Sequence, residues 1–190
     1  EIPGNAQATP LVWGDQVFVS TAISVGASNV NAGLFTRLTR RFTRTEGATE
    51  TLRYAVLALD RRNGRVIWEQ VVREEVPHEG KHQTGSWASS SAVTDGEVLC
   101  AFFGSRGLYC FTMTGQPLWD HDFGDMDIRM GFGEGASPAL YGNTIVVNWD
   151  HQGQSFITAL DKRTGHTLWR SARDEITSWA TPLVVEHNGR

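Results

Sequence analysis

The apolar residues of this chain fall in short runs separated by turns that contain glycine. In one recurring phrase, an apolar run ends in Leu-Asp or an equivalent pair, a tight turn follows, and a second run closes on tryptophan. The phrase occurs at residues 55–68, 108–119 and 157–169, so its tryptophans lie about 50 residues apart. A fixed period of this size is typical of a repeat architecture in which every copy folds into the same unit.

A second recurring phrase precedes each tryptophan phrase. It covers residues 8–19, 89–100 and 136–147, and a fourth copy begins at residue 180. In the first three copies two apolar runs are joined by Gly-Asp, Asp-Gly or Gly-Asn, pairs that favour tight hairpins because they accept a positive φ. Each unit is therefore predicted to consist of four short antiparallel strands, A to D, joined by hairpin turns.

Four-stranded units that repeat at this spacing predict an all-β fold, a β-propeller in which each unit is one blade. We expect residues 1–190 to form a single partial propeller domain of about three and a half blades. The expected boundaries are residues 8–72 for the first blade, 87–122 for the second, 135–172 for the third and 179–190 for the start of a fourth. A long insertion at residues 21–53 interrupts the first blade.

The tryptophan phrase resembles the tryptophan docking motif of the pyrroloquinoline-quinone-like β-propeller repeats, A-x-D-x-x-T-G-x-x-x-W. Residues 159–169 match it, residues 58–68 match with Asn63 in place of threonine, and residues 110–119 are a looser copy with Thr112 in place of aspartate. The resemblance implies secreted or periplasmic repeat proteins related to the outer-membrane-protein assembly lipoprotein, with rings of seven or eight blades. The chain is then expected to be a fragment of such a ring.

The same resemblance implies structural roles for the motif residues. Each tryptophan is expected to pack against the neighbouring blade, while the aspartate and threonine cap the turn between strands C and D. The residues assigned to blade docking are Asp60, Gly64, Trp68, Gly115, Trp119, Asp161, Thr164, Gly165 and Trp169.

Composition narrows the classes of partner. The net charge of −4 argues against nucleic-acid binding, which normally needs a basic surface. No run of residues approaches the roughly 18 apolar positions of a membrane helix, so membrane association would require an anchor that the sequence does not contain. A periplasmic or extracellular location is implied by the family resemblance alone.

The two cysteines flank a predicted hairpin whose tip is residues 104–107. If its loop is centred on Ser105, Cys100 and Cys110 face each other across the strands. A cross-strand disulfide is possible there, but its geometry is demanding. We favour two small buried hydrophobic side chains over a disulfide.

Strand connectivity sorts the loops by face. The A–B and C–D turns are short and share one face, whereas the B–C and D–A loops share the other and carry most of the unusual polar residues. Binding residues favour loops displayed on a rigid scaffold, so we take the B–C/D–A face, hereafter the loop face, as the candidate functional face. Its candidate residues are His78, Glu79, His82, Arg129, Glu134, Asp150, His151, Arg173, Asp174 and Glu175. Trp87 and Trp179, at the entry to strand A, could stack a ligand, although core packing is the favoured role.

Residues 78–82 formally match H-E-x-x-H, the zinc-protease signature. That motif works only on a helix, where both histidines share one face. Here Pro77 precedes it, Gly80 interrupts it, and strands flank it. Protease activity is therefore disfavoured, and a loop metal site that uses His78 or His82 with a carboxylate remains a weaker possibility than an ordinary polar loop.

Residues 33–44, within the insertion, are basic and carry an apolar stripe, which could contact a membrane surface or a partner. A surface loop is the favoured interpretation.

Three functions are consistent with these patterns. The first, which we favour, is a non-catalytic propeller that binds a protein partner or a small ligand through the loop face. The second is a dehydrogenase of alcohols or sugars that uses pyrroloquinoline quinone with Ca²⁺, as the resemblance allows. The alcohol-oxidising members stack the quinone on a disulfide between adjacent cysteines, a pair that this sequence lacks. The third is a metal-binding hydrolase that uses the His78 loop.

Overall fold

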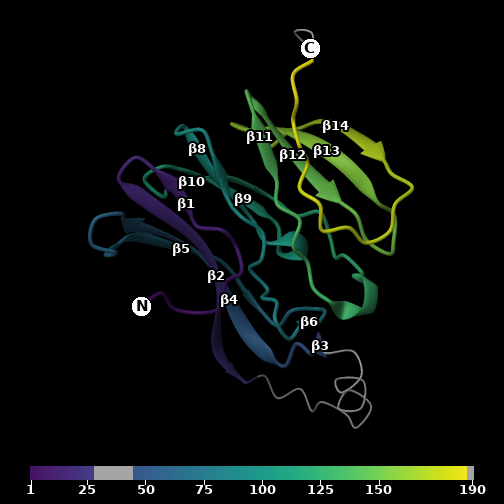
Figure 1. The fold of residues 1–190 in the computed structure, drawn as a ribbon, viewed down its shortest axis with the longest axis horizontal. Coiled ribbons are helices and arrows are strands. Elements are labelled where there is room, and N and C mark those ends of the chain that lie inside the picture. The colour runs from purple at the N-terminus through teal and green to yellow at the C-terminus, as the bar shows by residue number, and fades with distance from the viewer. Residues whose placement is uncertain (28–44, 188–190) are drawn as a thin grey trace.

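The computed structural model describes residues 1–27 and 45–187. Three antiparallel four-stranded sheets lie side by side, and a separate two-stranded sheet lies at one end of the molecule (Figure 1). In each large sheet the strands follow one another in chain order, so every sheet is a meander of strands A to D. Among the described residues no helix is long and apolar enough to cross a membrane.

The first sheet contains the longest strands. It is built from β1 (Leu11–Trp13), β2 (Gln16–Ala27), β4 (Glu50–Asp60) and β5 (Val66–Glu75). The pairing of β2 with β4 runs from Gln16 opposite Asp60 to Ala27 opposite Glu50. Both ends of the predicted insertion 21–53 are therefore strand, because continued antiparallel pairing satisfies their backbone groups. The amphipathic stretch 33–44 lies outside the described residues.

The second and third sheets have shorter strands. The second contains β7 (Val93–Thr94), β8 (Val98–Phe102), β9 (Leu108–Thr112) and β10 (Pro117–His121). The third contains β11 (Ala139–Tyr141), β12 (Thr144–Trp149), β13 (Phe156–Asp161) and β14 (Thr167–Ala172). Residues 173–187, which include the predicted start of a fourth blade, form no strand. The small sheet pairs β3 (Thr45–Glu46) with β6 (Lys81–His82).

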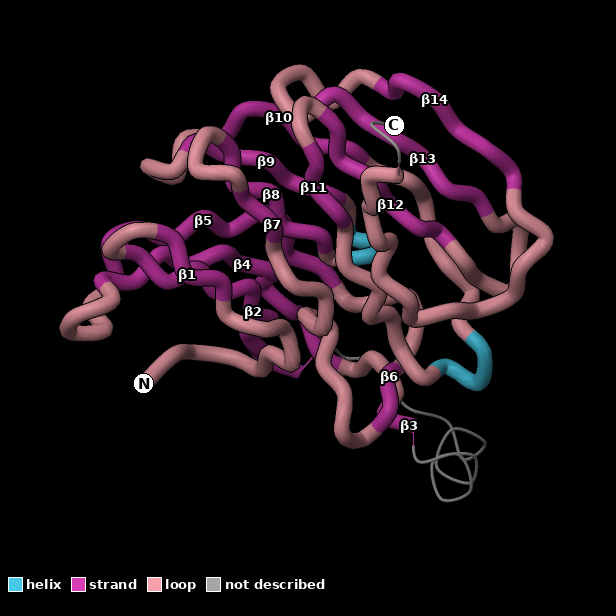
Figure 2. The backbone as a smooth tube through the Cα atoms, turned by 45° about the horizontal axis from the view of Figure 1, so that its top comes forward, coloured by secondary structure: helices cyan, strands magenta, loops and turns pink. Residues whose placement is uncertain are grey.

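Apolar side chains fill the two spaces between neighbouring sheets, and the second sheet lies between the other two (Figure 2). Phe18, Val56 and Phe111 belong to the cluster between the first and second sheets. Phe102 and Trp149 belong to the cluster between the second and third, with ring centroids 6.3 Å apart. Each sheet thus buries its apolar side chains against its neighbour, as blades of a propeller do.

The motif tryptophans of the first two sheets contact the next sheet along the chain. Trp68 Nε1 donates a hydrogen bond to the Met113 carbonyl (3.3 Å), and a Cβ on Gly115 would lie 2.6 Å from the Trp68 ring. Trp119 Nε1 likewise donates to the Lys162 carbonyl (2.9 Å). The third, Trp169, has no following sheet in the described chain and is 48 % exposed.

Hydroxyl side chains link successive units at the entry to strand A. The backbone N–H of Thr9 donates to Ser91 Oγ (2.9 Å), and that of Ser91 donates to Ser137 Oγ (2.9 Å). The N–H of Ser137 donates in turn to Thr181 Oγ1 (3.3 Å). The extended segment that contains Thr181 therefore occupies the position of a fourth strand A in this ladder.

Cys100 and Cys110 form a disulfide, which corrects the expectation of two free buried cysteines. They are directly opposite each other in the pairing of β8 with β9, with Cα atoms 4.1 Å apart. The short 3₁₀ turn at Gly104–Arg106 closes this hairpin and sets the register that aligns the two sulfur atoms. Both cysteines have an exposed fraction of 0 %, so the bond lies inside the core.

Candidate functional site

A small hollow lies on the loop face; its enclosed space of about 20 Å³ admits about one water-sized group and opens to solvent. Its wall combines the D–A loop that follows β5, the turn between β8 and β9, and the D–A loop that follows β10. The lining residues are Tyr54, Pro77, His78, Glu79, Gly80, Trp87, Ser89, Ser90, Phe103, Gly104, Arg106, Gly133 and Glu134. Three of the residues predicted from sequence, His78, Glu79 and Glu134, are therefore brought together at this hollow.

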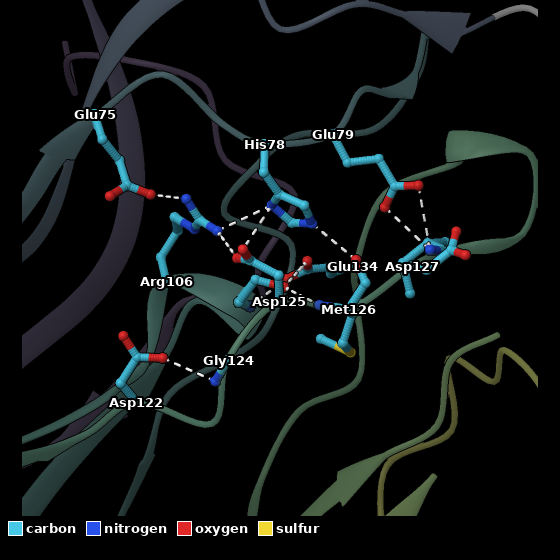
Figure 3. Close-up of polar contacts among 12 residues, drawn as sticks. Glu75, His78, Glu79, Arg106, Asp122, Gly124, Asp125, Met126, Asp127 and Glu134 are labelled. Carbon is cyan, nitrogen blue, oxygen red and sulfur yellow. Dashed lines mark hydrogen bonds and ion pairs between the residues drawn. The ribbon is translucent and has the colours of Figure 1, made fainter. Parts of the chain in front are cut away.

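Arg106 is the centre of the polar network in the wall (Figure 3). It lies in the 3₁₀ turn of the second sheet, its side chain is 9 % exposed, and it forms ion pairs with Glu75 and Asp125. Its Nη2 also donates to His78 Nδ1 at 2.9 Å. A buried guanidinium requires such partners, because removing it from water unpaired is costly.

The two ring nitrogens of His78 have different roles. Since a guanidinium can only donate, Nδ1 must accept the hydrogen bond from Arg106. Nε2 lies 2.8 Å from the Met126 carbonyl, which can only accept, and therefore carries the hydrogen. These hydrogen bonds assign the ring hydrogen to Nε2.

Glu134 lies against the turn that carries Arg106. Its carboxylate accepts from the Ser105 backbone N–H (2.6 Å) and from Ser105 Oγ, which itself accepts from the Met126 N–H (2.7 Å). Gly104 has φ +58°, and a Cβ there would overlap the carboxylate, so this turn requires glycine. Burial raises the pKa of the Glu134 carboxyl above its ordinary value, despite these hydrogen bonds.

Glu79 closes another part of the wall. Both of its carboxylate oxygens accept from the Ile128 backbone N–H, at 3.2 and 3.0 Å (Figure 3). Its backbone carbonyl accepts from Trp87 Nε1 at 3.3 Å. Burial raises the pKa of the Glu79 carboxyl, and the hydrogen bond from Ile128 opposes this effect.

Tyr54, in β4, is a buried residue of the wall. Its residue exposure is 1 %, and its hydroxyl has no hydrogen-bond partner among the described residues. Its ring packs edge-on against Phe103 with centroids 5.6 Å apart. Burial also raises the pKa of the Tyr54 phenol. An orphaned buried hydroxyl is rare in folded proteins and costs free energy until something binds it.

A second polar group lies between the loop after β12 and the end of β14. Arg173 Nε donates to Asp150 at 2.8 Å, and Asn148 Nδ2 donates to the same carboxylate at 2.9 Å. The Asp150 side chain is 0 % exposed, and its charge is balanced by Arg173. His151 Nδ1 accepts from the Asp127 backbone N–H at 3.1 Å. This group is not part of the hollow.

The remaining predicted residues are placed apart from the hollow. His82 lies at the end of β6, where Nδ1 contacts Thr84 Oγ1 at 2.8 Å. His78 and His82 thus have different partners, and they lie in a loop and a short strand rather than on a helix. The Arg129 backbone N–H donates to Thr177 Oγ1, and Asp174 and Glu175 are exposed.

Sequence reasoning missed the residues that organise the site. Arg106 and Ser105 are predicted only as part of a hairpin tip, and Tyr54, directly after the predicted insertion, is given no role. An arginine in a tight turn between two apolar strands is the one local signal that could have indicated a buried ion pair. Its acidic partners are distant in sequence, so spacing alone could not identify them.

The described residues do not match the site expected for a quinone with Ca²⁺. Within residues 1–27 and 45–187, no group of three or more His, Cys, Asp or Glu side chains could hold a metal ion. The Cys100–Cys110 disulfide is buried between the sheets, so it offers no exposed surface on which a ring could stack. No reaction step is therefore assigned to such a cofactor.

Known structures share the fold. A quinohemoprotein alcohol dehydrogenase from Pseudomonas putida matches with a TM-score of 0.52 and 16 % identity over 90 % of this chain and 21 % of that one. A europium-containing methanol dehydrogenase matches with a TM-score of 0.50 and 14 % identity over 90 % of this chain and 25 % of that one. A second quinohemoprotein alcohol dehydrogenase, from Comamonas testosteroni, matches with a TM-score of 0.51 and 14 % identity over 90 % of this chain and 21 % of that one. The chain thus spans between a fifth and a quarter of the length of these structures.

These matches and the three meander sheets confirm the predicted all-β partial propeller. No curated protein sequence is significantly similar to the chain. The profile of the family described as outer membrane protein assembly factor BamB matches residues 52–187. The chain therefore belongs to this family of pyrroloquinoline-quinone-like repeat proteins.

Proposed function

We propose that this propeller segment is non-catalytic and binds a protein partner or a small ligand through its loop face. The observation that carries the proposal is the network around Arg106, in which Glu75, His78 and Asp125 are held by one buried guanidinium. A network of this kind fixes the loops between two blades and presents a preorganised surface, which lowers the entropic cost of binding.

The engagement of the titratable groups also favours binding over catalysis. A general acid or base must exchange a proton with a substrate within hydrogen-bond reach. Both nitrogens of His78 are already hydrogen-bonded to protein atoms, and both oxygens of Glu79 and Glu134 accept backbone or hydroxyl hydrogens. These side chains hold the loops in place, which is a role for a scaffold.

A periplasmic or extracellular location is proposed with this function. The Cys100–Cys110 disulfide supports it, because disulfides persist in oxidising compartments and are rare in the cytosol. The family name refers to the assembly of outer membrane proteins, which agrees with such a location and with a protein partner.

Titration with pyrroloquinoline quinone and Ca²⁺ tests the non-catalytic part of the proposal. We expect no change in melting temperature with either compound or with both, and no dye-linked oxidation of alcohols or sugars. A saturable stabilisation that needs both compounds, together with oxidation of an alcohol, would replace this proposal with the dehydrogenase.

Site-specific photo-crosslinking tests the binding face. A crosslinking amino acid at Asp127, an exposed residue on the loop face, should give a discrete adduct with a partner in periplasmic extract, and the Arg106→Ala variant should lose it. The matched control places the same amino acid at Asn63, in a C–D turn on the opposite face. Equal adducts at both positions would contradict a loop-face site.

A further inference from the structure

Three side-chain donors around the hollow already have protein acceptors. Trp87 donates to the Glu79 carbonyl, Ser89 Oγ to the Ser86 carbonyl, and Ser90 Oγ to the Ala136 carbonyl. Acceptors, in contrast, remain available. The Tyr54 hydroxyl, which can both donate and accept, has no partner, and each Glu134 oxygen accepts one hydrogen bond from Ser105 and retains a lone pair. The carboxylate therefore favours a ligand that brings donors, and the Tyr54 oxygen can accept one of them.

The charges around the hollow also favour a ligand that donates hydrogen bonds and carries positive charge. The cations near the wall are paired, Arg106 with Glu75 and Asp125, and Lys81 with Glu46 at 2.7 Å. Arg73 also pairs with Glu75, at 2.6 Å, and with Asp122, at 3.0 Å. The two carboxylates that line the hollow, Glu79 and Glu134, have no ion-pair partner in the described part of the chain. The hollow therefore favours a ligand that brings positive charge.

The walls supply aromatic surface beside these carboxylates. Tyr54, Trp87 and Phe103 all line the hollow. Cations are attracted to the faces of such rings, and the Lys81 ammonium already lies 5.0 Å from the centroid of the Trp87 ring. Aromatic rings combined with unpaired carboxylates form the type of site that proteins use for alkylammonium groups.

We propose that this hollow binds a primary alkylammonium group, with Glu134 as its counter-ion and the Tyr54 phenol oxygen as a hydrogen-bond acceptor. This inference rests on the loop-face binding function proposed above and names its ligand chemistry. An ammonium brings three donors and one positive charge on a narrow apolar stem, which matches the unused acceptors, the unpaired carboxylates and the aromatic walls. The group can come from a free amine or from a lysine side chain of a partner.

Calorimetric titration of the whole chain with n-butylammonium chloride, against sodium chloride of equal ionic strength, tests the proposal. We expect saturable binding that weakens about tenfold in Tyr54→Phe and by at least as much in Glu134→Gln, because each removes one acceptor. Tyr141→Phe and Glu69→Gln, which alter exposed side chains outside the hollow, are matched controls and should bind as the parent does. Melting temperatures verify that every variant is folded. If Tyr54→Phe does not fold, Trp87→Leu gives an independent test, because it removes an aromatic wall of the hollow and should also weaken binding.

A second ligand distinguishes a free amine from a lysine side chain of a partner as the natural source of the ammonium group. A short peptide with one lysine and a blocked N-terminus should compete with butylammonium if the natural donor is a protein side chain. If butylammonium binds and the peptide does not, the hollow takes a free amine. Both outcomes support the ammonium site.

Three results would overturn the inference. These are no saturable binding of butylammonium, binding that Tyr54→Phe and Glu134→Gln leave unchanged, and binding of Ca²⁺ in preference to the ammonium. If the loop-face crosslink to a partner persists while butylammonium fails to bind, only the ammonium site is wrong. If butylammonium binds while quinone-dependent oxidation is observed, the non-catalytic proposal fails and the ammonium site stands.

Discussion

Trp119 of the second sheet lies over Gly165 of the third, so close that a Cβ on this glycine would be 2.6 Å from the indole ring. The same tryptophan donates from Nε1 to the Lys162 carbonyl of the same turn. Trp68 and Gly115 have the equivalent relationship one unit earlier. The glycines of the second and third C–D turns, Gly115 and Gly165, therefore have two roles, since each allows a positive φ and leaves room for the tryptophan of the preceding unit.

These two roles can be separated by substituting glycines at equivalent positions. Gly165 and Gly64 occupy the same place in the motif, with φ of +72° and +71°, but nothing lies within 4 Å of a Cβ on Gly64. Gly64→Ala should cost about 1 kcal/mol, from backbone strain alone. Gly165→Ala should cost about 2–4 kcal/mol, because the indole must also move. Urea unfolding measures both values, and equal losses would show that the tryptophan contact contributes nothing.

The repeat fold could be predicted from sequence because its signals are local. Apolar alternation, Gly-containing turns and a fixed period specify four-stranded meanders without any knowledge of long-range contacts. The extent of β2 and β4 was underestimated, because residues 21–27 and 50–53 belong to a longer hairpin whose register depends on pairing across the insertion. The blade boundaries rest on the repeat, and the docking roles of the motif residues rest on the family resemblance.

The candidate site was only partly predictable. Connectivity placed His78, Glu79 and Glu134 on one face, and the structure brings them to one hollow. Arg106 was missed, because its partners are distant in sequence: Glu75 ends β5, and Asp125 lies in the loop after β10. Sequence cannot show which of several surface carboxylates a buried guanidinium selects.

Loss of the Cys100–Cys110 disulfide should destabilise the second sheet. The bond closes a short loop, with a sequence separation of 10 residues, so chain entropy predicts a loss of about 3 kcal/mol in the double variant Cys100→Ala/Cys110→Ala. Both side chains are buried, so the alanines also leave space behind. Unfolding with and without reductant measures the effect. The parent should become less stable under reductant and the double variant should not, and a parent indifferent to reductant would contradict the expectation.

Arg106→Ala should be among the most damaging single substitutions on the loop face. It leaves Glu75 and Asp125 without their shared guanidinium and removes the hydrogen bond to His78, for an expected loss of about 2–3 kcal/mol. The matched control is Arg53→Ala, which removes an exposed pair with Glu74 at 3.3 Å and should cost less than about 1 kcal/mol. Denaturant unfolding compares the two variants. Similar losses would mean that the buried network adds nothing beyond a surface ion pair.

Glu134 should make the stability of the protein depend on pH. Burial raises the pKa of this carboxyl above its ordinary value of 4.5, so the folded protein holds the proton more tightly than the unfolded chain. The contribution to the free energy of unfolding is therefore complete below pH 4.5 and is lost as the pH rises toward the folded pKa. Glu134→Gln cannot titrate there, and its free energy of unfolding should fall less steeply with pH, by at most about 1.4 kcal/mol per pH unit.

Urea unfolding at half-unit intervals from pH 4.5 upward measures this slope for the parent, Glu134→Gln and the control Glu69→Gln. The comparison uses slopes and not absolute stabilities, because the amide also loses one of the two hydrogen bonds that Ser105 donates to the carboxylate. The control should keep the slope of the parent. If Glu134→Gln keeps it too, the carboxyl is ionised as readily in the folded protein as in the unfolded chain, and the hollow does not exclude enough water to favour a cation.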